Sequence, residues 1–256
     1  MIFDTHAHYD DNQFDEDRDS LLREMHKNGI SYILNASASL ESLDTSIELS
    51  QKYDFIYTSL GIHPHDVNKM DEAVLDKIGL LSRNSKVVAI GEIGLDYYYD
   101  NSPKDLQCYW FERQIELAKE LCLPIIIHDR DAHEDTIKII KKTNAEQVGG
   151  IFHCFSGSAQ MAMDMLKYNF YIAIGGVVTF KNARKTVEVV KAVPMEKLLV
   201  ETDCPYLAPE PFRGKRNNSG YLVHTIKKIA EIKGLSEAEV AKATLDNAKR
   251  IFNLSI

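Results

Sequence analysis

Residues 2–8, Ile-Phe-Asp-Thr-His-Ala-His, form a short segment of apolar and β-branched residues that ends in two histidines. Segments of this kind recur along the chain and alternate with longer segments of helical periodicity. The pattern predicts eight strands, at residues 2–8, 32–36, 55–60, 87–92, 124–128, 150–153, 170–174 and 198–203. It predicts nine helices, near residues 16–28, 40–52, 71–83, 105–121, 131–142, 158–168, 182–192, 219–233 and 236–252.

This alternation of strands and helices indicates the fold class. Eight strand-helix units in 256 residues match the size and order of a (β/α)8 TIM barrel. No linker rich in proline, glycine or serine divides the chain, so we predict an α/β protein with a single domain over residues 1–256. Alternation alone also allows a doubly wound open sheet. The wide distribution of the polar motifs described below favours a closed barrel.

The composition is that of a globular protein with a large core. Hydrophobic residues make up 45% of the chain and charged residues 27%, values typical of a folded domain. The four cysteines form no Cys-x-x-Cys pair, which argues against a disulfide framework and favours a cytoplasmic setting. No apolar stretch approaches the roughly 20 residues that span a bilayer, so no membrane segment is expected. The net charge of -8 argues against general electrostatic binding of nucleic acid, so any phosphate site must be local.

Polar side chains gather where the predicted strands end. In a parallel barrel these carboxyl ends form one rim, and the active sites of such folds lie there. A lone histidine or glutamate in a strand is more often a hydrogen-bonded structural group. That alternative is poor for a whole set on strands rich in Val, Ile and Leu, because burying so many acids and imidazoles without cations is costly. The set comprises His6, His8, His63, Glu92, His128, His153, Glu201 and Asp203.

Residues on the first and last predicted strands predict a site for one metal ion. His6 and His8 lie on the same face of a strand because successive side chains alternate. If the barrel closes, the last strand lies beside the first and brings Asp203 next to this histidine pair. These three side chains would then hold one divalent cation at the rim.

The middle strands predict a second ion. His128 and His153 come from neighbouring strands, and Glu92 on the strand before them is placed to bridge two cations. Two-metal hydrolase centres hold their ions about 3.5–4 Å apart. Imidazole ligands favour Zn or Mn, whereas phosphoryl-transfer enzymes frequently use Mg.

Seven short motifs follow one another along the chain. They are Asp4-Thr5-His6-Ala7-His8, Gly61-Ile62-His63-Pro64-His65, Gly91-Glu92-Ile93-Gly94-Leu95-Asp96, Ile127-His128, Phe152-His153-Cys154-Phe155-Ser156-Gly157, Val178-Thr179-Phe180-Lys181 and Glu201-Thr202-Asp203-Cys204-Pro205-Tyr206-Leu207. In this order they resemble the motifs of TatD-family metal-dependent deoxyribonucleases, within the amidohydrolase-like superfamily. The resemblance covers the whole chain and implies a TIM barrel with a divalent-metal centre. It assigns ligand roles to His6, His8, Glu92, His128, His153 and Asp203.

The resemblance also implies an activity. Family members hydrolyse phosphodiester bonds with metal-activated water, chiefly as 3′-5′ exonucleases on DNA, preferably single-stranded, with Mg or Mn in turnover. Asp203 is our candidate general base. His63 is expected to contact phosphate or protonate the leaving oxygen, and Glu201 to orient ligands or water. Glu92 completes the candidate catalytic set.

Substrate contacts are predicted near the same rim. Basic residues follow the last two strands, where barrels often bind phosphate, and aromatic residues after the fourth strand suit base stacking, with loop packing an equally good account of them. The candidate residues are His63, His65, Tyr97, Lys181, Arg213, Lys215, Arg216 and Asn217. One departure from the family is visible, because Asn217 precedes Asn218-Ser219-Gly220 where the family commonly has Glu-Pro.

Two other functions remain open. The same centre suits an ester or amide hydrolase, such as a D-aminoacyl-tRNA deacylase, because metal-activated water does not identify its electrophile. A metal-bound nucleic-acid-binding protein without turnover is a further alternative. DNA is the expected partner, and no surface pattern identifies a protein partner.

Overall fold

The computed structural model describes residues 1–99 and 101–254, and it confirms the eight predicted strands. The fourth and fifth strands extend beyond their predicted ends, and the eighth stops three residues early. Glu201 and Asp203 therefore lie just past the last strand. The strands are β1 (Ile2–Ala7), β2 (Ile30–Ala36), β3 (Ile56–Leu60), β4 (Val87–Asp96), β5 (Ile125–Arg130), β6 (Gly150–Phe152), β7 (Phe170–Ile174) and β8 (Leu198–Val200).

The nine predicted helices are also confirmed, with ends that differ from the prediction by a few residues. The Ser236–Glu239 capping box is present at the start of the last helix, as its sequence predicts. The helices are α1 (Arg18–Lys27), α2 (Ser42–Lys52), α3 (Glu72–Leu81), α4 (Lys104–Leu121), α5 (His133–Thr143), α6 (Ala159–Leu166), α7 (Arg184–Ala192), α8 (Leu222–Lys233) and α9 (Glu237–Ile251).

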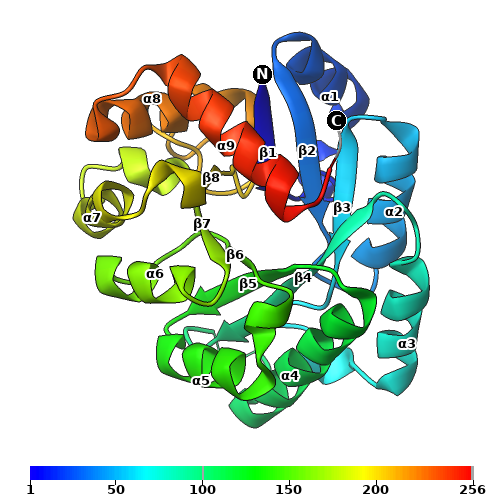
Figure 1. Ribbon diagram of the computed structural model, residues 1–256. Coiled ribbons are helices and arrows are strands. Elements are labelled where there is room, and N and C mark those ends of the chain that lie inside the picture. Colours follow the sequence, from blue (N-terminus) through cyan, green and yellow to red (C-terminus); the bar gives the residue numbers. More distant parts are fainter. Residues whose placement is uncertain (100, 255–256) are drawn as a thin grey trace.

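The strands pair in parallel in sequence order from β1 to β8, and helices surround them (Figure 1). The ring closes where the segment after β8 meets β1. There the His8 amide donates to the Cys204 carbonyl at 2.8 Å, and the Asp203 amide donates to the His6 carbonyl at 2.9 Å. The structure thus confirms the (β/α)8 barrel and excludes the open doubly wound sheet.

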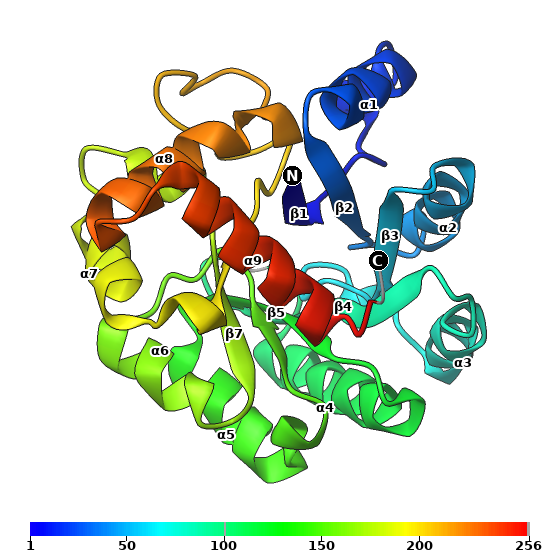
Figure 2. The same ribbon diagram turned by 45° about the horizontal axis from the view of Figure 1, so that its top comes forward.

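The barrel interior is apolar at the end where the strands begin. Residues from all eight strands form one buried cluster there, and α9 crosses this end of the barrel (Figure 2). Phe252, just past α9, packs on Phe3 with ring centroids 5.7 Å apart. This end is closed by packed side chains, so the opposite end is left for polar residues.

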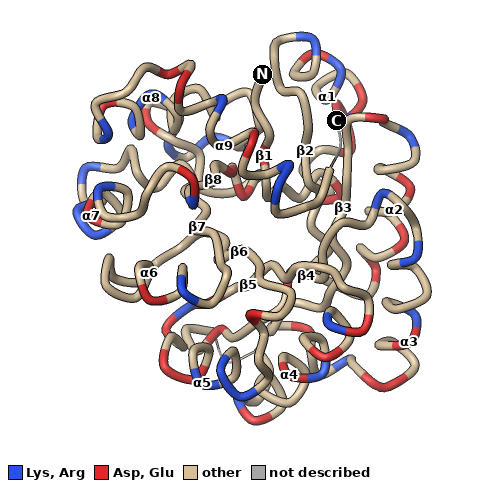
Figure 3. The backbone as a smooth tube through the Cα atoms, in the orientation of Figure 1, with Lys and Arg blue, Asp and Glu red and all other residues tan. Residues whose placement is uncertain are grey.

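The outer surface carries both signs of charge. Lys, Arg, Asp and Glu are spread over the outer helices (Figure 3). Among the described helices, none has the length and apolarity that crossing a bilayer requires.

Candidate metal centre

Strand alternation aims the predicted ligands into the barrel. Ile126, Ile151 and Leu199 belong to the interior cluster, and two residues further along each chain segment stand His128, His153 and Glu201. Because side chains alternate, these residues share the interior face. The interior face thus changes from apolar to polar side chains between two successive inward positions of each segment.

The first strand reaches the site differently. Phe3 belongs to the interior cluster, so strict alternation would turn His6 and His8 outward toward the helices. The β1–β2 pairing shifts register between Asp4 and Ala7, and such irregularities re-aim side chains. Both histidines face the centre because of this shift.

One group of candidate ligands forms around His6 and His8. Their Nε2 atoms lie 3.1 Å apart. Asp203 Oδ1 lies 3.4 Å from His8 Nε2 and 3.9 Å from His6 Nε2, and Glu92 Oε2 lies 3.2 Å from His6 Nε2. Ligand atoms about 2.1 Å from a shared ion are separated by roughly 3–3.5 Å. The spacing suits a single cation at the middle of the group.

A second group forms on the other oxygen of Glu92. Glu92 Oε1 lies 2.7 Å from His128 Nδ1 and 2.8 Å from His153 Nε2. His63 Nε2 lies farther away, at 3.6 Å from the same oxygen. The two carboxylate oxygens of Glu92 therefore face two different sets of imidazoles, as expected for a bridging ligand.

Neighbouring groups fix the orientation of the rings. His8 Nδ1 donates to the Ala36 carbonyl at 2.9 Å, which turns its Nε2 toward the centre. Glu201 accepts the Cys154 amide and lies 3.7 Å from His153 Nδ1. His6 Nδ1 and His153 Nδ1 are buried without hydrogen-bond partners. Glu201 is thus close to the His153 ring, and the orienting role predicted for it stays a prediction.

Burial and close charges shift the pKa values of the group. Burial lowers the pKa of His6 to about 4. Burial also lowers the pKa of His8, but Asp203 and Glu92 outweigh it and raise that pKa to about 9. For His153, burial is outweighed above all by Glu92, which raises the pKa to about 10. Burial raises the pKa of Glu92, yet the charges of His153 and its neighbours hold it well below its usual value. Burial raises the pKa of Glu201 to about 8.

The donor set fits divalent cations. Three groups of candidate ligands have their donor atoms within 4.8 Å of one another: His6-His8-Asp203, His6-His153-Glu201 and His63-Glu92-His128. Imidazole nitrogens and carboxylate oxygens are the ligands of catalytic zinc and manganese sites. Buried imidazoles without other partners are costly, and bound cations would compensate them. These clusters support divalent-metal binding.

A cavity of about 590 Å³ opens over the centre at the rim of the barrel. Predicted residues His8, His63, His65, Glu92, His128, His153 and Asp203 line it. Asp10, Asp11, Asp96, Tyr99, Arg130 and Tyr206 line it as well. Tyr99 is one of the aromatic residues after the fourth strand that suit base stacking, and no role was predicted for the other five. Asp96 stands in a motif that was recognised, and Arg130 lies two residues past His128 on the same strand, so strand periodicity was the signal available for both.

The remaining predicted substrate residues lie outside the lining of this cavity. Arg216 pairs with Asp17 at 2.5 Å, and Asn217 is fully buried with its side-chain amide donating to the Thr202 and Tyr206 carbonyls. Arg216 joins the loop to the segment before α1, and Asn217 holds the loop to the segment after β8. A substrate role for either stays a prediction.

Three other predicted substrate residues make contacts within the protein. The Arg213 guanidinium lies 3.8 Å from the Phe180 ring centroid, and the Lys215 ammonium lies 5.8 Å from that of Phe212. The Tyr97 hydroxyl donates to Asp135 at 2.9 Å. Lys181 is exposed. A substrate role for these four also stays a prediction.

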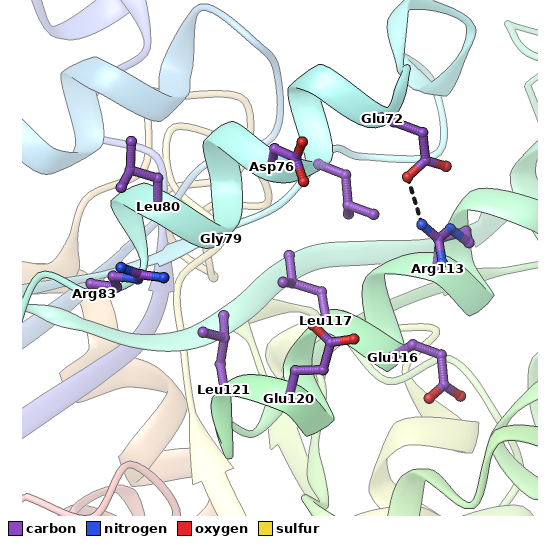
Figure 4. Close-up of a pocket in the computed structure, with 11 residues that line it drawn as sticks. Glu72, Asp76, Gly79, Leu80, Arg83, Arg113, Glu116, Leu117, Glu120 and Leu121 are labelled. Carbon is purple, nitrogen blue, oxygen red and sulfur yellow. Dashed lines mark hydrogen bonds and ion pairs between the residues drawn. The ribbon is translucent and has the colours of Figure 1, made fainter.

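Another hollow, of about 410 Å³, lies between α3 and α4 on the outer wall (Figure 4). Leu80, Leu117 and Leu121 face it, and Glu72 pairs with Arg113 at 2.6 Å at one end. None of the described residues that line it is a histidine or cysteine. This hollow therefore lacks the imidazole and thiol groups of a metal site, in contrast to the cavity at the rim of the barrel.

Two similar proteins are described as metal-dependent hydrolases. An uncharacterized metal-dependent hydrolase of Bacillus subtilis, YabD, is 49% identical over the full length of both chains. YcfH of Escherichia coli K12, described in the same words, is 34% identical over 99% of this chain and 96% of its own. Together with the site geometry, these relatives define the class: a metal-dependent hydrolase built on a (β/α)8 barrel.

The family follows from two further matches. A model described as TatD related DNase matches residues 3–253. The crystal structure of YjjV, a TatD homolog from E. coli K12, superposes with a TM-score of 0.92 at 31% identity and 98% coverage of both chains. A TatD-family hydrolase structure from Entamoeba histolytica has a TM-score of 0.90 at 25% identity, covering 99% of this chain and 98% of its own. The chain belongs to the TatD family, which confirms the resemblance of its motifs.

Proposed function

We propose that this protein is a two-metal deoxyribonuclease that removes nucleotides from the 3′ end of DNA, preferably single-stranded. One observation carries the proposal: the two oxygens of Glu92 face two separate sets of imidazoles. Two cations bridged by a carboxylate suit in-line displacement at phosphorus, where an attacking and a leaving oxygen both need stabilisation. The family description as a DNase supports the choice of substrate.

The ligands divide between two positions. His6, His8 and Asp203 would hold one cation. His128 and His153 would hold the other, and Glu92 contacts both sets of imidazoles. Bound divalent cations would activate water as the nucleophile and neutralise charge on the phosphoryl oxygens. We propose Mg or Mn as the ions in turnover, with Zn as an alternative that the imidazole ligands favour. All four cysteines are free, which fits the cytoplasmic location that we propose.

The other polar residues of the cavity handle protons and phosphate. Asp203 accepts the proton of the attacking water, since its Oδ1 lies at the centre and its side chain is partly open to the cavity. His63 Nδ1 accepts the His65 amide at 3.1 Å, so its Nε2 carries the proton and faces the cavity as a donor. His63 therefore donates to a phosphoryl oxygen or to the leaving oxygen, while Glu201 orients His153.

The test measures cleavage of 3′-labelled single-stranded DNA during titration with Mg and Mn. The variants are Glu92→Ala and Asp203→Ala, with Glu116→Ala on the outer face of α4 as a matched control. We expect mononucleotide release by the native protein and the control, and at least about a 10²-fold loss in both site variants. Circular dichroism checks that each variant is folded.

Parallel assays use a D-aminoacyl-tRNA ester and bis(4-nitrophenyl) phosphate under the same metals. Turnover of the D-aminoacyl ester alone, with DNA left intact, would overturn the nuclease in favour of a deacylase. Tight DNA binding with no cleavage under every metal would instead indicate a binding protein.

A further inference from the structure

Two exposed tyrosines and the half-buried Arg130 form a shelf beside the metal centre. Tyr98 is 59% exposed and Tyr99 is 46% exposed. The Arg130 guanidinium lies over both, 3.9 Å from the Tyr98 ring centroid and 4.9 Å from that of Tyr99. Tyr98, Tyr99 and Arg130 are called the aromatic shelf below.

Asp96 ties the shelf to the metal centre. Its Oδ1 accepts the backbone amides of Tyr98 and Tyr99 at 2.9 and 3.0 Å. Its Oδ2 accepts from His65 Nε2 at 2.8 Å and lies 3.1 Å from His128 Nε2. One buried carboxylate thus holds both the turn that carries the tyrosines and a candidate metal ligand, so the shelf is fixed relative to the reacting atoms.

Rings in edge-to-face contact lead from the centre to the shelf. His63 and His128 have centroids 4.3 Å apart, and so do His63 and His65. His65 lies 5.3 Å from Tyr99, and Tyr99 lies 4.8 Å from Tyr98. A substrate that leaves the centre along this wall meets an aromatic ring at each step, first imidazoles and then the two tyrosines.

The distribution of charge in the cavity favours binding of a polyanion on the side of the aromatic shelf. Asp10 and Asp11 line the cavity beyond His8, and Tyr206, which also lies there, donates its hydroxyl to Asp11. Among the described residues that line the cavity, Arg130 is the only arginine or lysine. Asp66 and Asp96 line the cavity too, but Asp66 pairs with Lys69 at 2.7 Å, and Asp96 accepts from His65 and two backbone amides. A phosphate chain would be repelled by Asp10 and Asp11 and attracted to Arg130.

We propose that the aromatic shelf binds an unpaired nucleobase and its adjoining phosphate, next to the scissile bond. The base stacks on the exposed tyrosine rings, and the Arg130 guanidinium contacts the phosphate. Stacking needs a base whose face is free, so the shelf gives preference to single strands over duplex ends. This inference rests on the proposed nuclease function and names the residues that read the strand.

The first experiment measures binding without turnover. Fluorescence anisotropy follows a labelled ten-nucleotide oligothymidylate with phosphorothioate linkages, in the presence of Mn. We expect Tyr99→Leu and Arg130→Gln each to weaken binding at least about fivefold, because the first removes a ring on which the base stacks and the second removes the charge that contacts the phosphate. Tyr99→Phe keeps the ring and should retain native affinity. Tyr109→Leu removes a tyrosine of similar exposure, 49%, from the outer face of α4 and is the matched control.

The second experiment separates the shelf from the chemistry. KM is measured for single-stranded DNA and for bis(4-nitrophenyl) phosphate, which has no base or second phosphate. We expect Tyr99→Leu to raise the ratio of the DNA value to the small-substrate value about fivefold or more, and to reduce the preference for single strands over blunt duplex. Native affinity and an unchanged ratio in folded Tyr99→Leu and Arg130→Gln variants would overturn the shelf. Absence of DNA cleavage by the native protein would overturn the nuclease function instead, and the anisotropy would still report on binding.

Discussion

Glu92 is the residue on which the candidate centre depends most. Its side chain is 4% exposed and lies within 3.6 Å of five imidazoles. A buried carboxylate is costly unless it is paired or coordinates a metal. The surrounding histidines keep it charged in the protein, and two of them, His8 and His153, carry protons that a cation must displace.

Proton competition predicts how metal binding depends on pH. The pKa values of about 9 for His8 and about 10 for His153 mean that both imidazoles carry protons at neutral pH before metal binds. A cation takes the same lone pairs, so each site releases about one proton on binding. The apparent affinity for Mn should therefore rise about tenfold per pH unit at each site between pH 6 and 8. Calorimetric titration of metal-stripped protein in two buffers of different ionisation enthalpy measures the protons released. An affinity that is the same at pH 6 and pH 8 would contradict this assignment.

Ser219 illustrates a departure from the family pattern with a visible structural role. Its hydroxyl donates to Asp4 Oδ2 at 2.6 Å, and Thr202 Oγ1 donates to the same oxygen at 2.6 Å. Asp4 is fully buried, and burial raises its pKa to about 6 in spite of these donors. The serine therefore helps to join β1 to the segment after β8, close to His6 and Asp203.

Replacing this serine should destabilise the fold. In Ser219→Ala the buried Asp4 carboxylate loses a donor, which costs about 1–3 kcal/mol. Urea unfolding of the native and variant proteins measures the difference. Ser20→Ala, at an exposed position on α1, should change stability by less than about 0.5 kcal/mol. Equal effects of the two substitutions would show that the Asp4 contact contributes nothing.

Strands and helices were predictable from the sequence because hydrophobic periodicity and capping residues are signals within each segment. The eight strands and nine helices all appear, because apolar alternation and capping residues are local signals. The register shift in β1 was not predictable, since it depends on how Asp4 and Ala7 pair with β2. Asp96 and Arg130 were overlooked for a different reason. Their strands were predicted to end at Glu92 and His128, whereas β4 and β5 continue to Asp96 and Arg130, which are partners in the register.

Close packing of β4 on β5 gives a prediction at the scale of elements. Gly94 has φ +142°, and a Cβ placed there would lie 2.0 Å from the His128 carbonyl oxygen. Gly94→Ala must therefore push the strands apart beside a candidate ligand, at a cost of about 3 kcal/mol or more. Gly234→Ala is the control, because Gly234 has φ +68° and open space around it, and its cost is about 1 kcal/mol. Thermal unfolding and Mn titration measure both variants, and equal stability losses would contradict the packing argument.

Barrel closure is what brings the two ends of the chain together at the site. Asp203 donates its backbone amide to the His6 carbonyl, almost two hundred residues away in the sequence. The histidines and carboxylates were identifiable from the sequence because they end apolar strands, and closure makes their convergence follow. The substrate surface was less predictable. Its basic candidates lie in loops whose contacts, such as that of Arg216 with Asp17, form only in the folded chain.

The charge of the whole molecule predicts how DNA binding responds to salt. With a net charge of -8, the protein has to hold DNA through a few local cations: Arg130 on the shelf and the exposed Lys181, Arg213 and Lys215 beyond it. Affinity falls as salt rises, and each neutralised phosphate of a single strand contributes about 0.7 to the magnitude of this negative slope of log affinity against log salt. We expect a magnitude between about 0.7 and 3 for oligothymidylate at fixed Mn, and a decrease of about 0.7 in Arg130→Gln. Anisotropy from 50 to 300 mM KCl measures both. A magnitude near 10 would require an extended basic interface and would contradict binding confined to the rim, because the charges on the outer helices are mixed (Figure 3).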